Sequence, residues 1–274
     1  MLALVTDSTC GLTRVEADEL GVIVLPMTYS VDGVRYSEAP VGENGDYGSL
    51  ISAGSRVETE AVHPSAFERV FRERLAAGDD VLCVTISSRL SGTFRSAEEA
   101  AAAVDPSGKR VVAFDSWNTA GALEFLVRRA HELAAGGCSL SEVVAGLAEA
   151  RRGTRIVFSV PDMGALFRSG RLGAIRRAVA TKLNRYPVMT LHEGGIEKYG
   201  DGRGARGRAA AMGRRAPEGS RELVVSHFGP RGVEAREVFL AARSRFPEAR
   251  VRVKDGGPVL AKHLGLGAVG LSWA

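Results

Sequence analysis

Short apolar runs rich in β-branched residues alternate with longer segments of helical period along this chain. Strands that are apolar throughout are typical of parallel sheets covered on both faces, and their alternation with helices indicates α/β layers. The expected strands are residues 2–6, 22–27, 81–86, 110–114, 155–159, 187–191, 222–227, 249–253 and 268–272. The expected helices are residues 13–20, 65–77, 93–103, 119–135, 140–151, 172–184, 204–215, 232–246 and 258–264.

The order of these elements also predicts how the chain divides. Its 274 residues allow one large or two ordinary domains. Strand and helix signals restart with less regularity after residues 151–154. We therefore expect two α/β domains, residues 1–153 with a mostly parallel sheet and residues 154–274. Within the second, residues 194–207 are rich in glycine and charge, which predicts a hairpin or an exposed loop.

Composition and spacing exclude several classes of function. The three cysteines lie far apart without a CxxC pair or a recognisable signal peptide, so we expect a reducing, cytoplasmic setting. The apolar runs have the length of strands, well short of the roughly 20 residues that a membrane span needs. The histidines are scattered, and no P-loop, HExxH or GxSxG motif occurs, so we expect neither a metal nor a cofactor.

A serine-glycine-threonine turn follows the expected strand 81–86. Ser91, Gly92 and Thr93 stand where the helix 93–103 begins. Backbone N–H groups at a helix start are unpaired and attract anions, the two hydroxyls add donors, and glycine lets a ligand approach the backbone. No base or metal ligand stands beside the turn in the sequence. The pattern therefore favours holding an anionic ligand over transforming it.

Other polar residues allow two interpretations each. Four of them directly follow expected strands, namely Asp7, Ser8, Asp115 and Ser116. Such side chains either cap the next helix or meet a ligand at the carboxyl edge of the sheet. His263, on the short helix 258–264, is either a structural hydrogen-bonding group or a ligand contact. If Ser91 and His263 meet, a serine hydrolase or acyltransferase is an alternative, although no third group that orients the histidine can be named.

A basic stretch begins with Arg203, Arg206 and Arg208 and continues to residue 215. It is either a solvated helix face or a docking surface for an acidic protein, an anionic lipid surface or nucleic acid. The formal charge of +4 is only mildly basic, and no aromatic residues are interleaved for base stacking. A regulatory nucleic-acid-binding module therefore stays a second alternative, and nucleic acid is not the partner that we expect.

Several motifs, taken in order, resemble the DegV family of bacterial fatty-acid-binding proteins over nearly the whole chain. They are VTDST at residues 5–9, VLPM at 24–27 with DGVRY at 32–36, ISSRLSGTF at 86–94, FDS at 114–116, SGRL at 169–172, and GPV at 257–259 through His263 to GAVGL at 267–271. The resemblance implies two α/β domains with a lipid site between them. It also implies that the ligand is a long-chain fatty acid and that the chain alone is not an enzyme.

The family's carboxylate-binding residues correspond to Thr59, Ser91 and His263 here, with Gly92 and Thr93 completing the turn around the serine. Two departures from the family pattern are visible. The Ser-Gln-Pro-Ser that follows the threonine in the family is lost after Thr59, and residues 261–262 replace the usual Gly-Thr before the histidine. We therefore expect a ligand that differs in head group or chain length from the familiar one.

The resemblance further implies a carrier role. Carriers of this kind present the bound acid to a separate fatty-acid kinase subunit, which phosphorylates the carboxylate with ATP for phospholipid synthesis. Arg171, Arg203 and Arg206, and more loosely Arg208, are the candidate contacts with that partner or, transiently, with a membrane surface. The expected protein is thus a cytoplasmic fatty-acid carrier.

Overall fold

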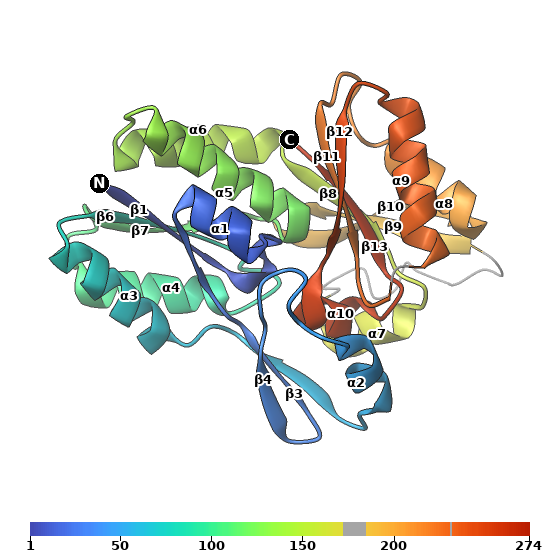
Figure 1. Cartoon of the computed structure of the whole chain (residues 1–274), viewed down its shortest axis with the longest axis horizontal. Helices are drawn as coiled ribbons and strands as arrows, with labels where there is room; N and C mark the ends of the chain where they lie inside the picture. Colours follow the sequence, from blue (N-terminus) through green and yellow to red (C-terminus); the bar gives the residue numbers. More distant parts are fainter. Residues whose placement is uncertain (172–184, 231) are drawn as a thin grey trace.

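The computed structural model describes residues 1–171, 185–230 and 232–274, and it contains three sheets (Figure 1). A parallel sheet has the strand order β2-β1-β6-β7, a mixed sheet has the order β10-β9-β8-β13-β11-β12, and a small antiparallel sheet has the order β4-β3-β5. The strands are β1 (Leu2–Asp7), β2 (Val22–Leu25), β3 (Thr28–Val31), β4 (Val34–Ser37), β5 (Val57–Glu60), β6 (Asp80–Thr85), β7 (Val111–Asp115), β8 (Arg155–Ser159), β9 (Arg185–His192), β10 (Gly195–Arg203), β11 (Glu222–His227), β12 (Arg250–Asp255) and β13 (Val269–Trp273).

The helices of the described residues connect these strands. They are the 3₁₀ helix η1 (Ser8–Cys10) and the α-helices α1 (Arg14–Leu20), α2 (Tyr47–Ala53), α3 (Pro64–Ala76), α4 (Thr93–Val104), α5 (Ala120–Ala135), α6 (Leu140–Gly153), α7 (Met163–Ser169), α8 (Gly204–Gly213), α9 (Val233–Arg245) and α10 (Gly257–Leu264). The local sequence explains where two of these helices begin. Thr13 with Glu16, and Ser139 with Glu142, form capping boxes for α1 and α6. None of the helices in the described part is long and apolar enough to cross a membrane.

The parallel sheet is covered on both faces, as its wholly apolar strands predict. Helices α3 and α4 pack on one face, and α5 and α6 pack on the other (Figure 1). The central strand β6 carries Val81, Leu82 and Cys83, none of which is exposed to solvent. The mostly parallel sheet that the sequence predicts for the N-terminal part is therefore confirmed.

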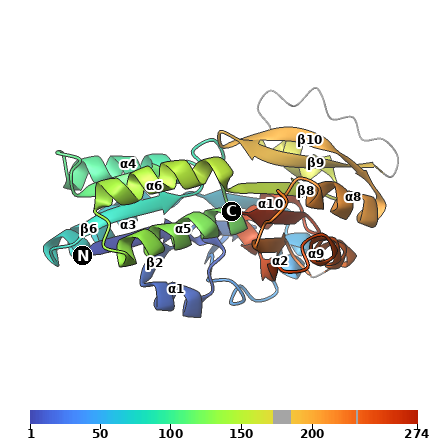
Figure 2. The ribbon, with the colours of Figure 1, turned by 90° about the horizontal axis from the view of Figure 1, so that it is seen from above.

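Helix α5 packs against both large sheets. It contacts β1 and β6 of the parallel sheet and β11 and β13 of the mixed sheet, whose other face carries α9 (Figure 1). The start of α5 approaches the mixed sheet closely, because a Cβ atom on Gly121 would lie 2.7 Å from Cβ of Val224. Seen from above, the N-terminal layers and strands β9 and β10 lie at opposite ends of the molecule (Figure 2).

The small antiparallel sheet is the main departure from the sequence-based expectation. The expected strand 22–27 ends at Leu25, because Pro26 has no N–H group for the ladder. The chain then turns into β3, which pairs with β4 and with β5. Helices α2 and α7 were also not expected. Residues 194–207, expected as a hairpin or an exposed loop, form only the second strand β10 of a hairpin with β9 and the start of α8. The two-residue turn of that hairpin is Glu193 and Gly194, both at positive φ.

Two further expectations are not decided by the fold. The helix expected at residues 172–184 lies outside the described residues. The division into residues 1–153 and 154–274 stays a prediction.

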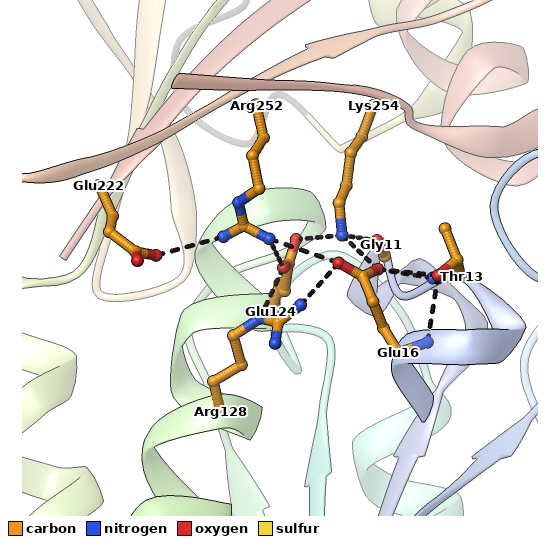
Figure 3. Close-up of polar contacts among 8 residues, drawn as sticks. All are labelled: Gly11, Thr13, Glu16, Glu124, Arg128, Glu222, Arg252 and Lys254. Atoms are coloured by element: carbon orange, nitrogen blue, oxygen red, sulfur yellow. Dashed lines mark hydrogen bonds and ion pairs between the residues drawn. The ribbon is translucent and has the colours of Figure 1, made fainter. Parts of the chain in front are cut away.

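A cluster of charged side chains joins α1 and α5 to the mixed sheet (Figure 3). Glu124 on α5 has no solvent exposure and forms ion pairs with Arg128, Arg252 and Lys254. Glu16 on α1 pairs with the same three cations. The buried Glu124 and the partly buried Glu16 thus each have several cationic partners, which is the condition under which buried charge is tolerated.

Candidate functional site

A mostly apolar cavity of about 230 Å³ lies between elements of the N-terminal and C-terminal parts of the chain. Its apolar lining comes from both parts, namely Met27, Ala61, Ile86, Leu90, Ile156, Phe158, Leu166, Leu191, Ile196, Phe228, Val259, Leu260 and Leu264. Its polar lining consists of Thr59, Ser91, Thr119, Arg171 and His263, with the backbone of Gly92. Such a composition suits a ligand that is largely hydrocarbon and carries few polar groups.

The turn after β6 supplies Ser91 and Gly92. The Ser91 hydroxyl accepts a hydrogen bond from the N–H of Thr93 at 3.2 Å and forms another with Oγ1 of Thr93 at 3.0 Å. Thr93 is fully buried and its Oγ1 also accepts from the N–H of Val62 at 3.4 Å, so it braces the turn and does not line the cavity. A Cβ atom on Gly92 would meet that of Ala61 at 3.8 Å, which is an ordinary contact.

His263 and Thr59 form the second polar group of the cavity. Nε2 of His263, on α10, lies 2.8 Å from Oγ1 of Thr59 on β5, while Nδ1 of His263 is buried without a partner. The pKa of His263 is lowered to about 3, chiefly by burial and to a smaller extent by the positive charges of Lys262 and Arg171. The imidazole is therefore neutral near pH 7, and it offers hydrogen bonds without a positive charge.

Glu38, which sequence reasoning missed, positions the helix that carries His263. Its Oε1 accepts the N–H of Val259 at 2.9 Å in the first turn of α10, and its Oε2 accepts the hydroxyl of Ser8 at 2.6 Å. Gly257 begins α10 at φ +81°, and a Cβ atom there would lie 2.4 Å from Oε1 of Glu38. The pKa of Glu38 is raised to about 7, chiefly by burial and to a smaller extent by the negative charges of Asp7 and Asp255, against the opposing effect of the hydrogen bonds from Ser8 and Val259.

The strand-end residues form local structure. Asp7 accepts hydrogen bonds from Thr9 at the start of η1 and from the N–H of Ile86. Asp115 accepts from the N–H groups of Ser88 and Trp117, and Ser116 bonds the backbone of Asn118. Ser8, the fourth strand-end residue, bonds Glu38 and the N–H of Met27. Since none of the four lines the cavity, the structural interpretation describes them better than the ligand interpretation.

Of the arginines expected at a partner surface, the structure brings only Arg171 to the cavity. Its side chain is exposed, and its Nε donates to the carbonyl of Leu90 at 3.4 Å. Arg203 ends β10, and Arg206 on α8 lies 3.6 Å from Glu237, both away from the cavity lining. Arg208 is only 1% exposed, so its assignment to a contact surface is wrong. Its guanidinium packs over Tyr186 and approaches Glu234 instead.

The hydroxyl and the imidazole that a serine hydrolase would use both have partners in the structure. Ser91 bonds Thr93 and His263 bonds Thr59, so each partner of the hydrolase alternative is engaged by a threonine. Over residues 1–171, 185–230 and 232–274, no group of three or more histidine, cysteine, aspartate or glutamate residues could hold a metal ion.

Known proteins match this chain over nearly its full length. The family model described as an uncharacterised protein of the DegV family matches residues 1–274. A DegV domain-containing protein of Halalkalibacterium halodurans is 28% identical over 99% of this chain and 98% of its own length. A DegV domain-containing protein of Deinococcus radiodurans is 29% identical over 99% of this chain and 97% of its own.

Solved structures share the fold. A DegV family protein from Thermus thermophilus, described for its fatty acid binding, superposes with a TM-score of 0.86 at 31% identity, covering 99% of this chain and 98% of its own. DegV from Bacillus subtilis, described as a fatty acid binding protein, has a TM-score of 0.85 at 25% identity, covering 99% and 98% of the two chains. The α/β architecture of this chain is therefore that of these proteins.

Proposed function

The chain belongs to the DegV family, and from that premise we propose that it binds a long-chain fatty acid in the cavity between its N-terminal and C-terminal parts. The observation that carries the proposal is the convergence of Thr59, Ser91 and His263 on one mostly apolar cavity. The fatty acid binding described for the Thermus thermophilus and Bacillus subtilis proteins supports the same ligand class.

The carboxylate lies, in this proposal, at the end of the cavity formed by these three side chains and Gly92. A buried carboxylate is costly unless several donors satisfy it. The hydroxyls of Thr59 and Ser91 and the neutral imidazole of His263 provide such donors, and bonds to a charged acceptor are the stronger kind. The cations Arg171 and Lys262 beside the histidine supply long-range compensation for the charge.

The acyl chain occupies the apolar remainder of the cavity. Phe158 of β8, Leu191 of β9 and Phe228 after β11 are among its walls. Each methylene group that leaves water contributes about 0.8 kcal/mol. Most of the affinity should therefore come from the tail, and most of the orientation from the head group.

We assign the protein a non-catalytic carrier role, in which a separate fatty-acid kinase subunit phosphorylates the presented carboxylate. Arg171 is exposed beside the cavity, so it is the contact that we propose for this partner, with Arg203 and Arg206 as secondary contacts with the partner or a membrane surface. The cytoplasm is the proposed setting, because thiols such as those of the free Cys10, Cys83 and Cys138 stay reduced there.

The hydrolase alternative is less well supported. A histidine whose pKa lies near 3 is a weak general base at neutral pH, and its Nε2 is bonded to Thr59. Covalent labelling of Ser91 by a fluorophosphonate probe would favour this alternative.

The proposal is tested by titrating delipidated protein with palmitate or oleate. Ser91→Ala and His263→Ala should each weaken binding by roughly tenfold, the cost of one hydrogen bond to a charged group. Ser88→Ala is the matched control, because Ser88 stands in the same turn and is exposed to solvent. No detectable fatty acid binding by the native protein, or equal affinities of all four proteins, would contradict the proposal.

A further inference from the structure

Thr119 is a polar residue of the cavity lining that is not part of the proposed carboxylate-binding site. It follows β7 and directly precedes α5, and its side chain is 7% exposed. Its hydroxyl oxygen is buried and has no hydrogen-bond partner. A buried hydroxyl without a partner is destabilising, so its retention calls for an explanation.

Helix capping does not explain this threonine. Thr13 and Ser139 occupy the equivalent N-cap positions of α1 and α6, and both side chains accept a backbone N–H of the helix. Thr119 also has extended N-cap geometry, with φ −157° and ψ 174°, but its side chain makes no such bond to α5. The hydroxyl that normally caps a helix is thus left without a partner, in a residue that lines the cavity.

Apart from Nδ1 of His263, which is also buried without a partner, the other polar side chains of the cavity have partners within the protein. Thr59 bonds His263, Ser91 bonds Thr93, and Arg171 donates to the carbonyl of Leu90. None of these bonds reaches Thr119, whose hydroxyl therefore depends on something other than the protein for a partner.

The surroundings of Thr119 are mostly apolar. Its neighbour Ala120 packs in the same apolar cluster as Ile156 and Phe158, and both of these residues line the cavity. Helix α5 begins against the mixed sheet, where Gly121 faces Val224 and Ser272. An unsubstituted alkyl chain in this region offers Thr119 nothing to bond.

We propose that Thr119 and the start of α5 recognise an oxygen atom carried along the acyl chain, so that the preferred ligand is a hydroxylated or oxo fatty acid. The inference rests on the proposed fatty acid binding and narrows its ligand class. The hydroxyl of Thr119 donates to the ligand oxygen, and a ligand hydroxyl can donate in return. The carboxylate stays with Thr59, Ser91 and His263.

The test compares the affinity of delipidated protein for stearate with that for a series of hydroxystearates, each substituted at a different carbon. The native protein should bind at least one member roughly tenfold more tightly than stearate, the difference expected when a buried hydroxyl gains its partner. Thr119→Val should reverse this order, because it weakens binding of that hydroxystearate and tightens binding of stearate. Thr119→Ser should restore the native order.

The outcomes separate this inference from the proposed function. If stearate binds and no hydroxystearate binds more tightly, the role of Thr119 is overturned while fatty acid binding stands. If neither class binds, the proposed function itself fails, and the inference with it. The profile of the native protein decides the question even if Thr119→Val does not fold.

Discussion

Oγ1 of Thr59 lies 2.8 Å from Nε2 of His263, although 204 residues separate them in the sequence. The contact exists because α10, from the C-terminal part, packs against β3 and β5 of the small N-terminal sheet. The polar end of the cavity is therefore assembled only when the two parts of the chain come together.

The state of His263 can be observed directly. Because its pKa is about 3, we expect its imidazole Cε1–H signal to show no titration between about pH 5 and pH 8. Proton NMR measures the signal, and its absence from the spectrum of His263→Gln identifies it among the five histidines. A midpoint near the ordinary value of 6.5 would show that the residue is not desolvated as described.

Glu38 should make the stability of the protein depend on pH. Its pKa is raised from 4.5 to about 7 on folding, so the folded state keeps its proton at pH values where the unfolded chain has lost it. The free energy of unfolding therefore falls as the pH rises through this window and stays lower above it. Glu38→Gln removes the effect and keeps a side chain that can bond both Val259 and Ser8.

Urea unfolding at about pH 5 and pH 8 measures this dependence. The stability of Glu38→Gln relative to the native protein should rise by roughly 2–4 kcal/mol from the lower to the higher pH. A difference that is the same at both pH values would mean that Glu38 titrates normally.

The carboxylates of the charged cluster in Figure 3 should contribute unequally to the free energy of unfolding. Glu124 has no exposure and faces three cations, so Glu124→Gln should cost roughly 3 kcal/mol by leaving buried positive charge uncompensated. Glu222 is 46% exposed and lies 3.4 Å from Arg252, so Glu222→Gln should cost less than about 1 kcal/mol. Chemical denaturation checks both values, and similar costs would refute the description of the cluster as buried.

The approach of α5 to the mixed sheet leaves no room for a side chain. Gly121→Ala places a methyl group 2.7 Å from Cβ of Val224 and should cost roughly 1–3 kcal/mol through overpacking. Gly213→Ala on α8 meets nothing within 4 Å and should instead gain about 0.5 kcal/mol. Thermal unfolding distinguishes the two variants, and a neutral Gly121→Ala would show that the sheet and helix move apart easily.

Much of the layered fold can be predicted from periodicity, and the missed elements show where that signal ends. Strand β6 is predictable because its central residues, 81–84, are buried on both faces of the sheet and are all apolar. Strands β4 and β5 have four residues each with mostly partial or full exposure, so their sequences contain few buried apolar positions. They form a sheet through pairing with β3, which a local pattern does not reveal.

The candidate site is likewise predictable only where its residues form a local sequence pattern. The turn at Ser91 can be recognised from the local sequence, because a strand, small polar residues and a helix follow one another. The role of Glu38 cannot be recognised in this way, since its partner Val259 lies 221 positions away and nothing in the neighbouring sequence indicates helix capping. Thr119 is the first residue of an expected helix, and only the structure shows that it is an N-cap without a capping bond and that it lines the cavity.

Because α5 is shared by two sheets, the order of synthesis matters. During translation, residues 120–135 emerge from the ribosome long before β11 and β13 are synthesised. The side of α5 that contacts these two strands is therefore exposed to solvent on the nascent polypeptide. That surface is covered only after translation has reached the last strand. The N-terminal part alone should therefore be prone to aggregation, and a chaperone that shields this helix would benefit maturation.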